Sequence, residues 1–267
     1  MTDSCDVRDV IGLIPAGGQA ARLGRLPCSK ELYPIGFQQG PTRAPKVACH
    51  YLLECMRAAG IARAFIVLRA GKWDIPAYFG DGAWLSMDLA YLMMGAPFGA
   101  PYTLDQAWPF VRDARIALGF PDILFEPADA YARLLAHQSS TGAEVVLGLF
   151  PAARPHNCDM VALGAQGQVR QIVIKPAATE LRYTWMIAVW TPVFTQFMHA
   201  HLVGLLDRQS LAARELFVGD VLQAAIDAGL RVEAECFDDG RALDIGTPED
   251  LQHAVSRYSQ LGRPMPR

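Results

Sequence analysis

The sequence lacks a long apolar run, an excess of positive charge and a low-complexity linker. None of its apolar segments reaches the roughly 18 residues that a membrane-spanning helix needs. The first residues, MTDSCDVRDV, contain no apolar core of the kind found in signal peptides. The formal net charge is −3, so the chain offers no basic surface to a nucleic-acid backbone. These absences argue against a membrane protein and against DNA or RNA as a partner.

Cysteine is present, but without the spacings that give it a structural role. The six cysteines form no CxxC pair and no metal-finger pattern; they are Cys5, Cys28, Cys49, Cys55, Cys158 and Cys236. Unpaired thiols are typical of proteins from reducing compartments. The sequence therefore predicts reduced cysteines and a cytoplasmic location.

Short apolar strands alternate with helical patterns through the first part of the chain. Segments typical of buried strands lie at 10–15, 64–68, 88–93, 114–118 and 143–150. Helical patterns lie between them, at 46–59, 103–111 and 128–138. This alternation predicts an α/β protein, a Rossmann-like three-layer α/β/α sandwich with a mixed, mostly parallel sheet.

The pattern changes after Pro151. Residues 159–175 contain two β patterns around a glycine-containing turn, which predicts a hairpin. One more strand and two helices are predicted after it, at 183–190, 193–204 and 218–229. No repeat or linker divides the chain, so we expect residues 1–267 to form a single domain with a late β-rich region.

The segment IPAGGQAARLGRLPCSKELYPI, residues 14–35, is the first candidate for chemistry. It places a strand before a Gly-Gly loop and two cations, Arg22 and Lys30. Bare backbone N–H groups can approach a phosphate closely, and the cations can neutralise it. The segment matches neither the P-loop nor the GxGxxG pattern. On these residues alone, an ordinary turn with solvated surface cations is the alternative.

Six segments also follow the motifs of one enzyme family, in that family's order. They are AGGQAARL (16–23), SKELYPI (29–35), YFGDGAWLSMDLAYL (78–92), ALGFPDILF (117–125), VRQIVIKP (169–176) and ALDIGTPEDL (242–251). Together with the opening strand they cover residues 11 to about 255. On these segments the chain resembles the sugar-phosphate nucleotidyltransferases, in particular the glucose-1-phosphate thymidylyltransferase group.

The resemblance implies a magnesium-dependent reaction between a nucleoside triphosphate and a sugar 1-phosphate or similar phosphorylated acceptor, with release of pyrophosphate. It divides the chain into a nucleotide-binding part, 8–150, and a part for the acceptor and the second metal ligand, 151–255. It implies Arg22, Lys30 and Lys175 as catalytic residues and Asp122 and Asp244 as ligands of Mg²⁺. The implied nucleotide-binding residues are Ala16, Gly17, Gly18, Arg22, Met94 and Gly99. The implied acceptor-binding residues are Asp159, Lys175 and Trp185.

Several residues depart from the family pattern. Ala20 and Ala21 replace the Gly and Thr of the family's G-x-G-T-R-L. The family's first metal aspartate directly follows Leu-Gly, whereas Phe120 and Pro121 come between here. Two alternatives follow for Asp122. Either the loop is two residues longer and Asp122 still reaches the metal, or Asp122 is a turn residue and that ligand is lost.

The acceptor side departs further. Ile174 replaces a family glutamate that meets sugar hydroxyls, and Asp159 stands where sugar enzymes have glycine. In a hairpin whose paired residue numbers sum to about 332–334, Asp159 would lie opposite Val173, Ile174 or Lys175. The hypothesis is that Asp159 takes over acceptor binding; the alternative is that it pairs with Lys175 or faces water.

Two other site assignments have a structural alternative. Met94 aligns with the family's base-reading glutamine but is equally typical of a core. Trp185 lies in a strand that the family uses beside the sugar, yet tryptophan is commonly a packing residue. The base of the triphosphate is therefore left open.

Two other functions also stay open. A non-catalytic protein that binds a nucleotide or sugar nucleotide would explain the altered glycine loop, and a phosphorylated alcohol could replace the sugar phosphate. The sequence does not fix the oligomeric state, so a homo-oligomer is one option. Because the chain ends shortly after ALDIGTPEDL, we expect it to lack the long C-terminal additions of some relatives.

Overall fold

One nine-stranded sheet forms the centre of the protein, which is represented by a computed structural model that describes residues 10–38, 43–95, 99–207 and 215–261. Its strands are β1 (Val10–Ala16), β4 (Arg63–Leu68), β5 (Asp88–Met93), β6 (Arg115–Leu118), β8 (Val145–Pro151), β9 (Met160–Leu163), β10 (Val169–Val173), β11 (Tyr183–Trp190) and β12 (Val232–Cys236). From one edge they follow the order β5-β4-β1-β6-β11, and β11 continues to β8-β12 and to β9-β10. Only β10 and β11 run against the direction of β1, so the sheet is mixed and mostly parallel.

The central strands are buried on both faces, because their side chains alternate between two apolar cores. In β1, Val10 and Ile14 enter one core, whereas Ile11 and Leu13 enter the other. The same alternation separates Ile187 from Ala188 in β11, so burial of both faces continues across the sheet. Such strands need a helix layer on each side.

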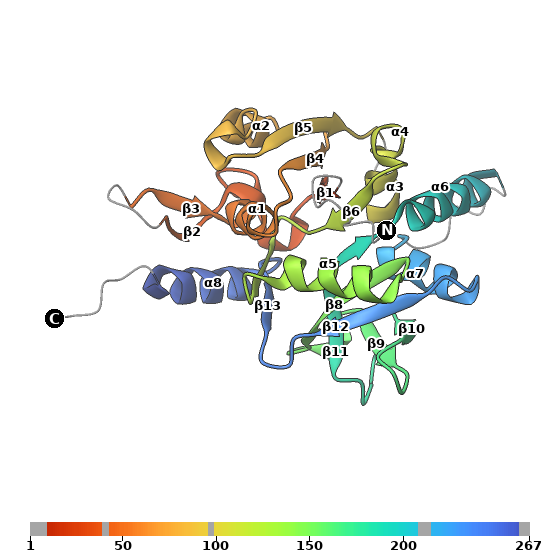
Figure 1. Cartoon of the computed structure of the whole chain (residues 1–267). Coiled ribbons are helices and arrows are strands. Elements are labelled where there is room, and N and C mark those ends of the chain that lie inside the picture. The colour runs from red at the N-terminus through yellow and green to blue at the C-terminus, as the bar shows by residue number, and fades with distance from the viewer. Residues whose placement is uncertain (1–9, 39–42, 96–98, 208–214, 262–267) are drawn as a thin grey trace.

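Helices supply these two layers (Figure 1). The first core contains side chains of α1 (Ala48–Ala58), α2 (Asp74–Phe79) and α5 (Ala130–Thr141). The second contains side chains of α3 (Ala100–Asp105), α6 (Pro192–Asp207) and α7 (Val218–Asp227), with α4 (Trp108–Val111) beside them. The predicted three-layer α/β/α sandwich is therefore confirmed.

The late β-rich region joins the sheet through β11. Along one edge, β11 pairs with β6 at Ala188 to Trp190 and with β9 at Tyr183 and Thr184. Its other edge pairs with β8, and the register of that pair shifts between Trp185 and Ile187. The predicted hairpin is present, and its pairs Met160 with Val173 and Val161 with Ile172 sum to 333, as expected.

Two small sheets flank the central one. β2 (Pro34–Phe37) pairs with β3 (Pro45–Val47), and β7 (Ile123–Glu126) pairs antiparallel with β13 (Arg241–Asp244). A third apolar cluster joins both small sheets to α1 and to α8 (Pro248–Leu261) through Ile35, Ala48, Leu124, Ile245, Ala254 and Tyr258. This cluster brings a strand from the end of the chain against one from its middle.

The predicted elements are confirmed with small shifts at their ends. Strands at 88–93 and 183–190 have the expected bounds, whereas the helical pattern at 103–111 divides into α3 and α4. Five short strands were not predicted; they are β2, β3, β7, β12 and β13. Each is short or carries polar residues, as in β12 (VEAEC), so the apolar periodicity is weak there.

Two expectations about the whole chain can be checked on the described part. Among its helices, none combines the length and the apolar character needed to span a bilayer. Cys28, Cys49, Cys55, Cys158 and Cys236 are free thiols, as expected. Cys5 lies outside the described residues.

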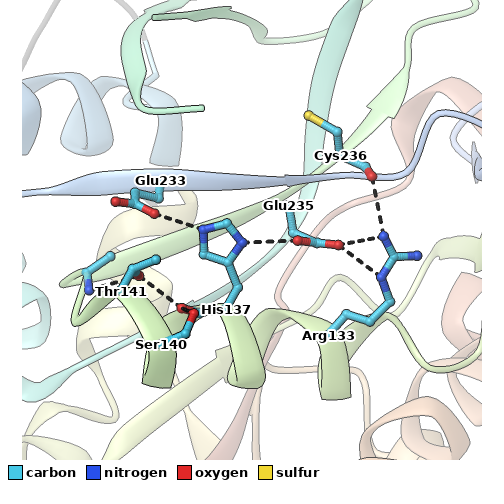
Figure 2. A network of polar contacts seen from close by, with 8 residues as sticks. Arg133, His137, Ser140, Thr141, Glu233, Glu235 and Cys236 are labelled. Carbon is cyan, nitrogen blue, oxygen red and sulfur yellow. Dashed lines mark hydrogen bonds and ion pairs between the residues drawn. The ribbon is translucent and has the colours of Figure 1, made fainter. Parts of the chain in front are cut away.

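A polar network ties α5 to β12 on the outside of the sandwich (Figure 2). The His137 ring lies between two carboxylates of β12, with Nε2 2.8 Å from Glu233 and Nδ1 3.0 Å from Glu235. Arg133 Nε donates to Glu235 at 2.9 Å, and Arg231 Nε donates to Glu233 at 2.6 Å. Burial would lower the pKa of His137, but its hydrogen bonds to Glu235 and Glu233 outweigh this and raise the pKa.

This network predicts a pH-dependent contribution to stability. Because the pKa of His137 is higher in the folded state, its contribution is complete below the ordinary histidine value and is lost as the pH rises through the folded value. His137→Gln should therefore lower the free energy of unfolding at pH 5.5 by on the order of 1 kcal/mol, and by less at pH 8.5. Urea unfolding at both pH values measures this, with the exposed His253→Gln as the control. An equal loss at both pH values would contradict a charged ring.

Candidate active site

The carboxyl end of β1 is the place where the order of the sheet strands reverses. The chain runs from β1 through β4 to β5 on one side and then returns to β6 on the other. In open α/β sheets, ligands bind in the crevice outside the carboxyl ends of the strands at such a point. The segments that follow β1 and β6 contain the glycine loop and Asp122, so these predicted site residues share one edge of the sheet.

The glycine loop lies between Met94 and Lys30. A Cβ on Gly17 would lie 2.5 Å from Sδ of Met94, so any other residue there would require the methionine side chain to shift. A Cβ on Gly18 would lie 3.8 Å from Nζ of Lys30, so the bare loop and the cation converge. Ala16 is the buried last residue of β1 and leads directly into the loop. This is the arrangement of backbone and charge that a phosphate chain requires.

Ala20 takes the conformation that usually requires glycine. Its φ is 53° and its ψ is 29°, in the left-handed region, immediately before the 3₁₀ turn η2 (Ala21–Leu23). The resemblance places a family glycine at this position, and the backbone keeps the glycine conformation although the residue has changed. An L-residue there costs roughly 1–2 kcal/mol. The loop is therefore strained at the candidate site.

Lys30 is held by two anchors on the neighbouring residues of the 3₁₀ turn η3 (Lys30–Leu32). Glu31 is 1% exposed and accepts a hydrogen bond from Nζ of the buried Lys72 at 2.5 Å. Ser29 donates to Asp74 twice, from its backbone N and from Oγ, each at 2.7 Å. These contacts fix the backbone on both sides of Lys30, and an ion pair with Asp122 positions its ammonium group.

Backbone pairing brings Asp122 and Asp244 together. Asp244 ends β13 opposite Ile123, and the backbone N of Ile245 donates to the carbonyl of Asp122 at 3.0 Å. Gly119, between β6 and Asp122, leaves no room for a Cβ because Leu52 and the hydroxyl of Tyr131 pack against it. Phe120 and Pro121 do not carry Asp122 away from the second carboxylate. This arrangement agrees with the longer-loop alternative.

The two carboxylates form a centre of negative charge with cations on either side. Asp122 forms an ion pair with Lys30, and Arg22 Nη2 lies 4.0 Å from Oδ2 of Asp244. Burial and the neighbouring Asp122 raise the pKa of Asp244 to about 6, although Lys30 and Arg22 oppose the shift. Burial would lower the pKa of Lys30, but the carboxylate of Asp122 raises it. The two carboxylates therefore favour the binding of a cation between them and their neighbours.

The donors at this centre fit Mg²⁺. Oδ1 of Asp244 is buried and, within the described ranges, has no hydrogen-bond partner. Mg²⁺ is commonly held by one or two carboxylates together with phosphates and water. No cluster of three or more His, Cys, Asp or Glu side chains in the described part of the chain is placed to hold a metal ion. Two carboxylates open to a phosphate suit a metal that is shared with the substrate.

Asp159 lies on the acceptor side, against the start of α7. A Cβ on Gly219 would lie 2.6 Å from Oδ2 of Asp159, so glycine allows the carboxylate to reach the helix N-terminus. The carbonyl of Asp159 accepts a hydrogen bond from Thr184 Oγ1 at 3.0 Å. Burial raises the pKa of the adjacent Cys158 thiol, and the carboxylates of Asp244 and Asp159 raise it further. Asp159 and Asp244 therefore both lie within electrostatic reach of the Cys158 thiol.

Lys175 and Trp185 have partners of their own. Lys175 follows β10 with a left-handed φ of 41°, and its Nζ lies 3.8 Å from the centre of the Phe217 ring. Trp185 is 6% exposed and packs against Phe120, with 5.8 Å between ring centres. Its burial agrees with the packing alternative, although Nε1 has no hydrogen-bond partner among the described residues.

Met94 and Gly99 are linked through Thr103. Thr103 Oγ1 lies 3.3 Å from the carbonyl of Gly99 and 3.6 Å from Sδ of Met94. Met94 is 7% exposed and belongs to the second apolar core, which agrees with its structural alternative. Gly99 has a φ of 113°, and the carbonyl of Leu216 leaves no space for a side chain there. The two residues form one wall beside the glycine loop.

Several residues around this centre are not among those predicted from the sequence. The buried pair of Glu31 and Lys72 was hidden because Glu31 lies inside the SKELYPI motif and Lys72 lies in no motif. Arg154 was missed because it stands in a loop without a recognised pattern. Asp250 could have been found, because Thr247 followed three residues later by an acid is a helix-capping pattern, and Thr247 Oγ1 donates to Asp250 at 2.7 Å.

Comparison with known proteins identifies the family of the chain. The family model described as nucleotidyl transferase matches residues 11–260. The low-salt glycan biosynthesis nucleotidyltransferase Agl11 of Haloferax volcanii is 23% identical over 248 residues, which are 91% of this chain and 64% of that protein. The glucose-1-phosphate thymidylyltransferase of Streptomyces griseus is 25% identical over 246 residues, 90% of this chain and 63% of that protein. The chain thus spans slightly less than two thirds of these curated relatives.

A solved structure supports the fold over the whole length. It is a Bacillus anthracis protein, provisionally assigned as a glucose-1-phosphate thymidylyltransferase and crystallised with sucrose. The match has a TM-score of 0.80 at 17% identity and covers 97% of this chain and 98% of that one. At this identity the likeness shows the shared fold alone.

The strain at Ala20 predicts that glycine is the more stable residue there. Ala20→Gly removes a left-handed alanine at roughly 1–2 kcal/mol but adds unfolded-state entropy worth roughly 0.5–1 kcal/mol. The free energy of unfolding should therefore rise by up to about 1 kcal/mol, which is about 2–4 °C in Tm. Ala21→Gly is the matched control, because Ala21 has no left-handed backbone and should lose stability. A gain in both variants would contradict strain at Ala20.

The repulsion at Asp244 predicts a variant that is more stable than the wild type. With a folded pKa of about 6, Asp244 weakens the metal-free fold as the pH rises through that value. Asp244→Asn should thus have a higher Tm than the wild type at pH 8 in EDTA, and the difference should shrink towards pH 4. Asp250→Asn is the control of opposite sign, because hydrogen bonds from Arg154 and Thr247 outweigh burial and lower its pKa. A lower Tm for Asp244→Asn at pH 8 would refute the repulsion.

Proposed function

Because the chain belongs to the nucleotidyl transferase family, whose model spans residues 11–260, we propose that it transfers a nucleoside monophosphate to a phosphorylated acceptor. The donor is a nucleoside triphosphate, the acceptor is a sugar 1-phosphate or similar phosphate monoester, and pyrophosphate is released. The observation that carries this proposal is the convergence of Gly18, Lys30, Asp122 and Asp244 at the carboxyl edge of the sheet.

The reaction suits a site built from charge rather than from a general base. An acceptor phosphate oxygen attacks the α-phosphorus, and the bond from that phosphorus to the pyrophosphate oxygen breaks. A phosphate monoester is already anionic near pH 7, so no proton must be removed from the nucleophile. Alignment of the two substrates and neutralisation of their charge then account for catalysis.

The residues of the site divide between the two substrates. For the nucleotide, the proposed groups are Ala16, Gly17 and Gly18 around the phosphates, Met94 and Gly99 beside the base, and the cations Arg22 and Lys30. For the acceptor they are Asp159, Lys175 and Trp185. The left-handed backbone of Lys175 supports its role, since strain of this kind concentrates at functional positions.

Asp122 and Asp244 are the residues that would hold Mg²⁺ in this proposal. The ion would supply positive charge to the phosphates during transfer. Lys30 forms an ion pair with Asp122 directly. With the carboxylates holding the ion, the ammonium group of Lys30 would be available to bind the triphosphate.

The proposal also concerns the acceptor, the cellular location and the organisation of the chain. The names of the two curated relatives favour a sugar phosphate as acceptor, since one is a glucose-1-phosphate thymidylyltransferase and the other acts in glycan biosynthesis. The free thiols favour the cytoplasm as location. Homo-oligomer formation and the division into parts 8–150 and 151–255 remain predictions.

A pyrophosphate-release assay with a panel of triphosphates and hexose 1-phosphates tests the function. Wild-type protein with Mg²⁺ should release pyrophosphate only when both substrates are present. Lys30→Ala and Arg22→Ala each remove a positive charge aimed at the reacting phosphates, and Asp244→Asn removes a proposed ligand of Mg²⁺, so each should lower kcat/KM by about 10²-fold or more. Arg57→Ala, an exposed residue of α1, is the control and should keep wild-type rates.

The same assay separates the alternatives. Absence of release with every pair of substrates would favour the non-catalytic binding protein. Release with phosphorylated alcohols but not with hexose 1-phosphates would assign a non-sugar acceptor. Near wild-type turnover in Lys30→Ala and Arg22→Ala would remove the triphosphate site from this loop.

A further inference from the structure

Arg154 lies on a third loop at the edge of the sheet where the site is. β8 runs in the same direction as β1 and β6, with β11 between it and β6, so the loop that follows it, residues 152–159, leaves the sheet at the same end as the glycine loop and Asp122. This loop connects the strand β8 to the hairpin that contains the proposed acceptor residues. Arg154 therefore stands at the boundary between the two proposed substrate regions.

The side chain of Arg154 points to the start of α8. Its Nη2 donates to Oδ1 of Asp250 at 2.5 Å, and the side chain is 47% exposed. Asp250 also accepts from Thr247 through its other oxygen, so the carboxylate is itself held in place. A guanidinium has five N–H donors in a planar fork. The bond to Asp250 thus orients Arg154 and leaves donors for a second anion.

Two arginines flank the carboxylates of the charged centre. The hydrogen bond to Asp250 is the main cause that raises the pKa of Arg154, and the carboxylate of Asp244 contributes to the same shift. Arg22 also contributes to the lowered pKa of Asp250 and lies 4.0 Å from Asp244. Arg22 belongs to the glycine loop and Arg154 to the loop that leads to Asp159. Two different loops therefore each supply one arginine within electrostatic reach of these carboxylates.

We propose that Arg154 binds the phosphate of the acceptor and directs it towards the α-phosphorus of the nucleotide. The proposal rests on the proposed function, because it assigns a further residue to the acceptor of that same site. A phosphate monoester carries a charge of about −1.5 to −2 near pH 7 and must lie beside a second polyanion. A planar guanidinium can bind it through two parallel N–H bonds, which fix its orientation as well as its charge.

The alternative is that the pair of Arg154 and Asp250 only fastens the loop 152–159 to α8. The two explanations differ in which partner matters. If the pair is merely structural, then loss of either residue should have the same effect. If Arg154 binds the acceptor, then only loss of the arginine should weaken that substrate.

Steady-state kinetics of three variants decide between them. Arg154→Met should raise the KM of the acceptor by about tenfold or more and leave the KM of the triphosphate within about twofold. Arg154→Lys should restore part of the loss, because it returns the charge without the planar fork. Asp250→Asn is the matched control, since it removes the charge of the ion pair but keeps an amide oxygen that can accept the orienting hydrogen bond from Arg154, and its acceptor KM should stay within about threefold. Unchanged constants in Arg154→Met, or equal defects in Arg154→Met and Asp250→Asn, would overturn the proposal.

A binding experiment keeps the inference separate from the proposed function. Glucose 1-phosphate with Mg²⁺ should raise the Tm of the wild type and of Asp250→Asn, and should raise that of Arg154→Met much less. If the wild type shows no turnover but this difference in Tm is seen, Arg154 stands as a phosphate-binding residue while the catalytic function fails. If turnover is present and all three proteins gain equally in Tm, the function stands and Arg154 is not an acceptor residue. If the wild type neither turns over nor gains in Tm, both are wrong.

Discussion

The central physical constraint in this protein is that two carboxylates are held together by backbone pairing. Asp122 and Asp244 cannot move apart, because Asp244 ends a strand that pairs with the strand following Asp122. Like charges at close range raise each other's free energy, and partial burial adds to the effect. Lys30 and Arg22, from the N-terminal part of the chain, partly neutralise this negative charge. The folded protein therefore has a cation-attracting site at the point where anionic substrates are proposed to meet.

The apolar clusters around Asp122 and Asp244 offset the free energy that is needed to hold these two like charges together. Leu124 lies two residues after Asp122, and Ile245 directly follows Asp244. Both are almost completely buried in the cluster that joins α1 to α8. The buried pair of Glu31 and Lys72 fixes the segment that bears the main cation. Removing one partner of such a pair typically costs several kcal/mol, since the other is left buried and uncompensated. The packing energy of the core thus holds charged groups in positions that are electrostatically unfavourable for them.

The sequence predicted the α/β class, the order of the main strands and helices, and the hairpin register, because these depend on local patterns. Periodic apolar runs such as 88–93 report burial directly. The register followed from turn position alone, since paired residues on one hairpin have a constant sum. Motif order pointed to Lys30, Asp122 and Asp244 as neighbours, although more than 200 residues separate the first from the last.

What the sequence could not predict depends on tertiary contact. The strand β12 is rich in glutamate, and its carboxylates are satisfied only by His137, Arg133 and Arg231 in the folded protein. Likewise, nothing in the pattern around Lys72 marks it as buried, because its partner Glu31 is 41 residues away. The left-handed backbone at Ala20 was also hidden, since alanine gives no signal of that conformation. Polar pairs and strained residues of this kind are the features that local periodicity cannot report.

The strand β11 has a consequence for the separation between Asp122 and Asp159. One edge of this single strand carries β6, which leads to Asp122, and also carries β9, which follows Asp159. From Thr184 to Ala188 the strand spans at most about 13 Å at the rise of an extended strand, and its register with β8 shifts within this stretch. The length of β11 between the two pairings therefore sets how far apart the segments that contain Asp122 and Asp159 can lie. Insertion of one residue between these two pairings would lengthen β11 by about 3.3 Å and would turn the following side chains to the opposite face of the sheet. The separation between Asp122 and Asp159, the proposed acceptor residue, thus depends on the register of β11 as well as on the loops around it.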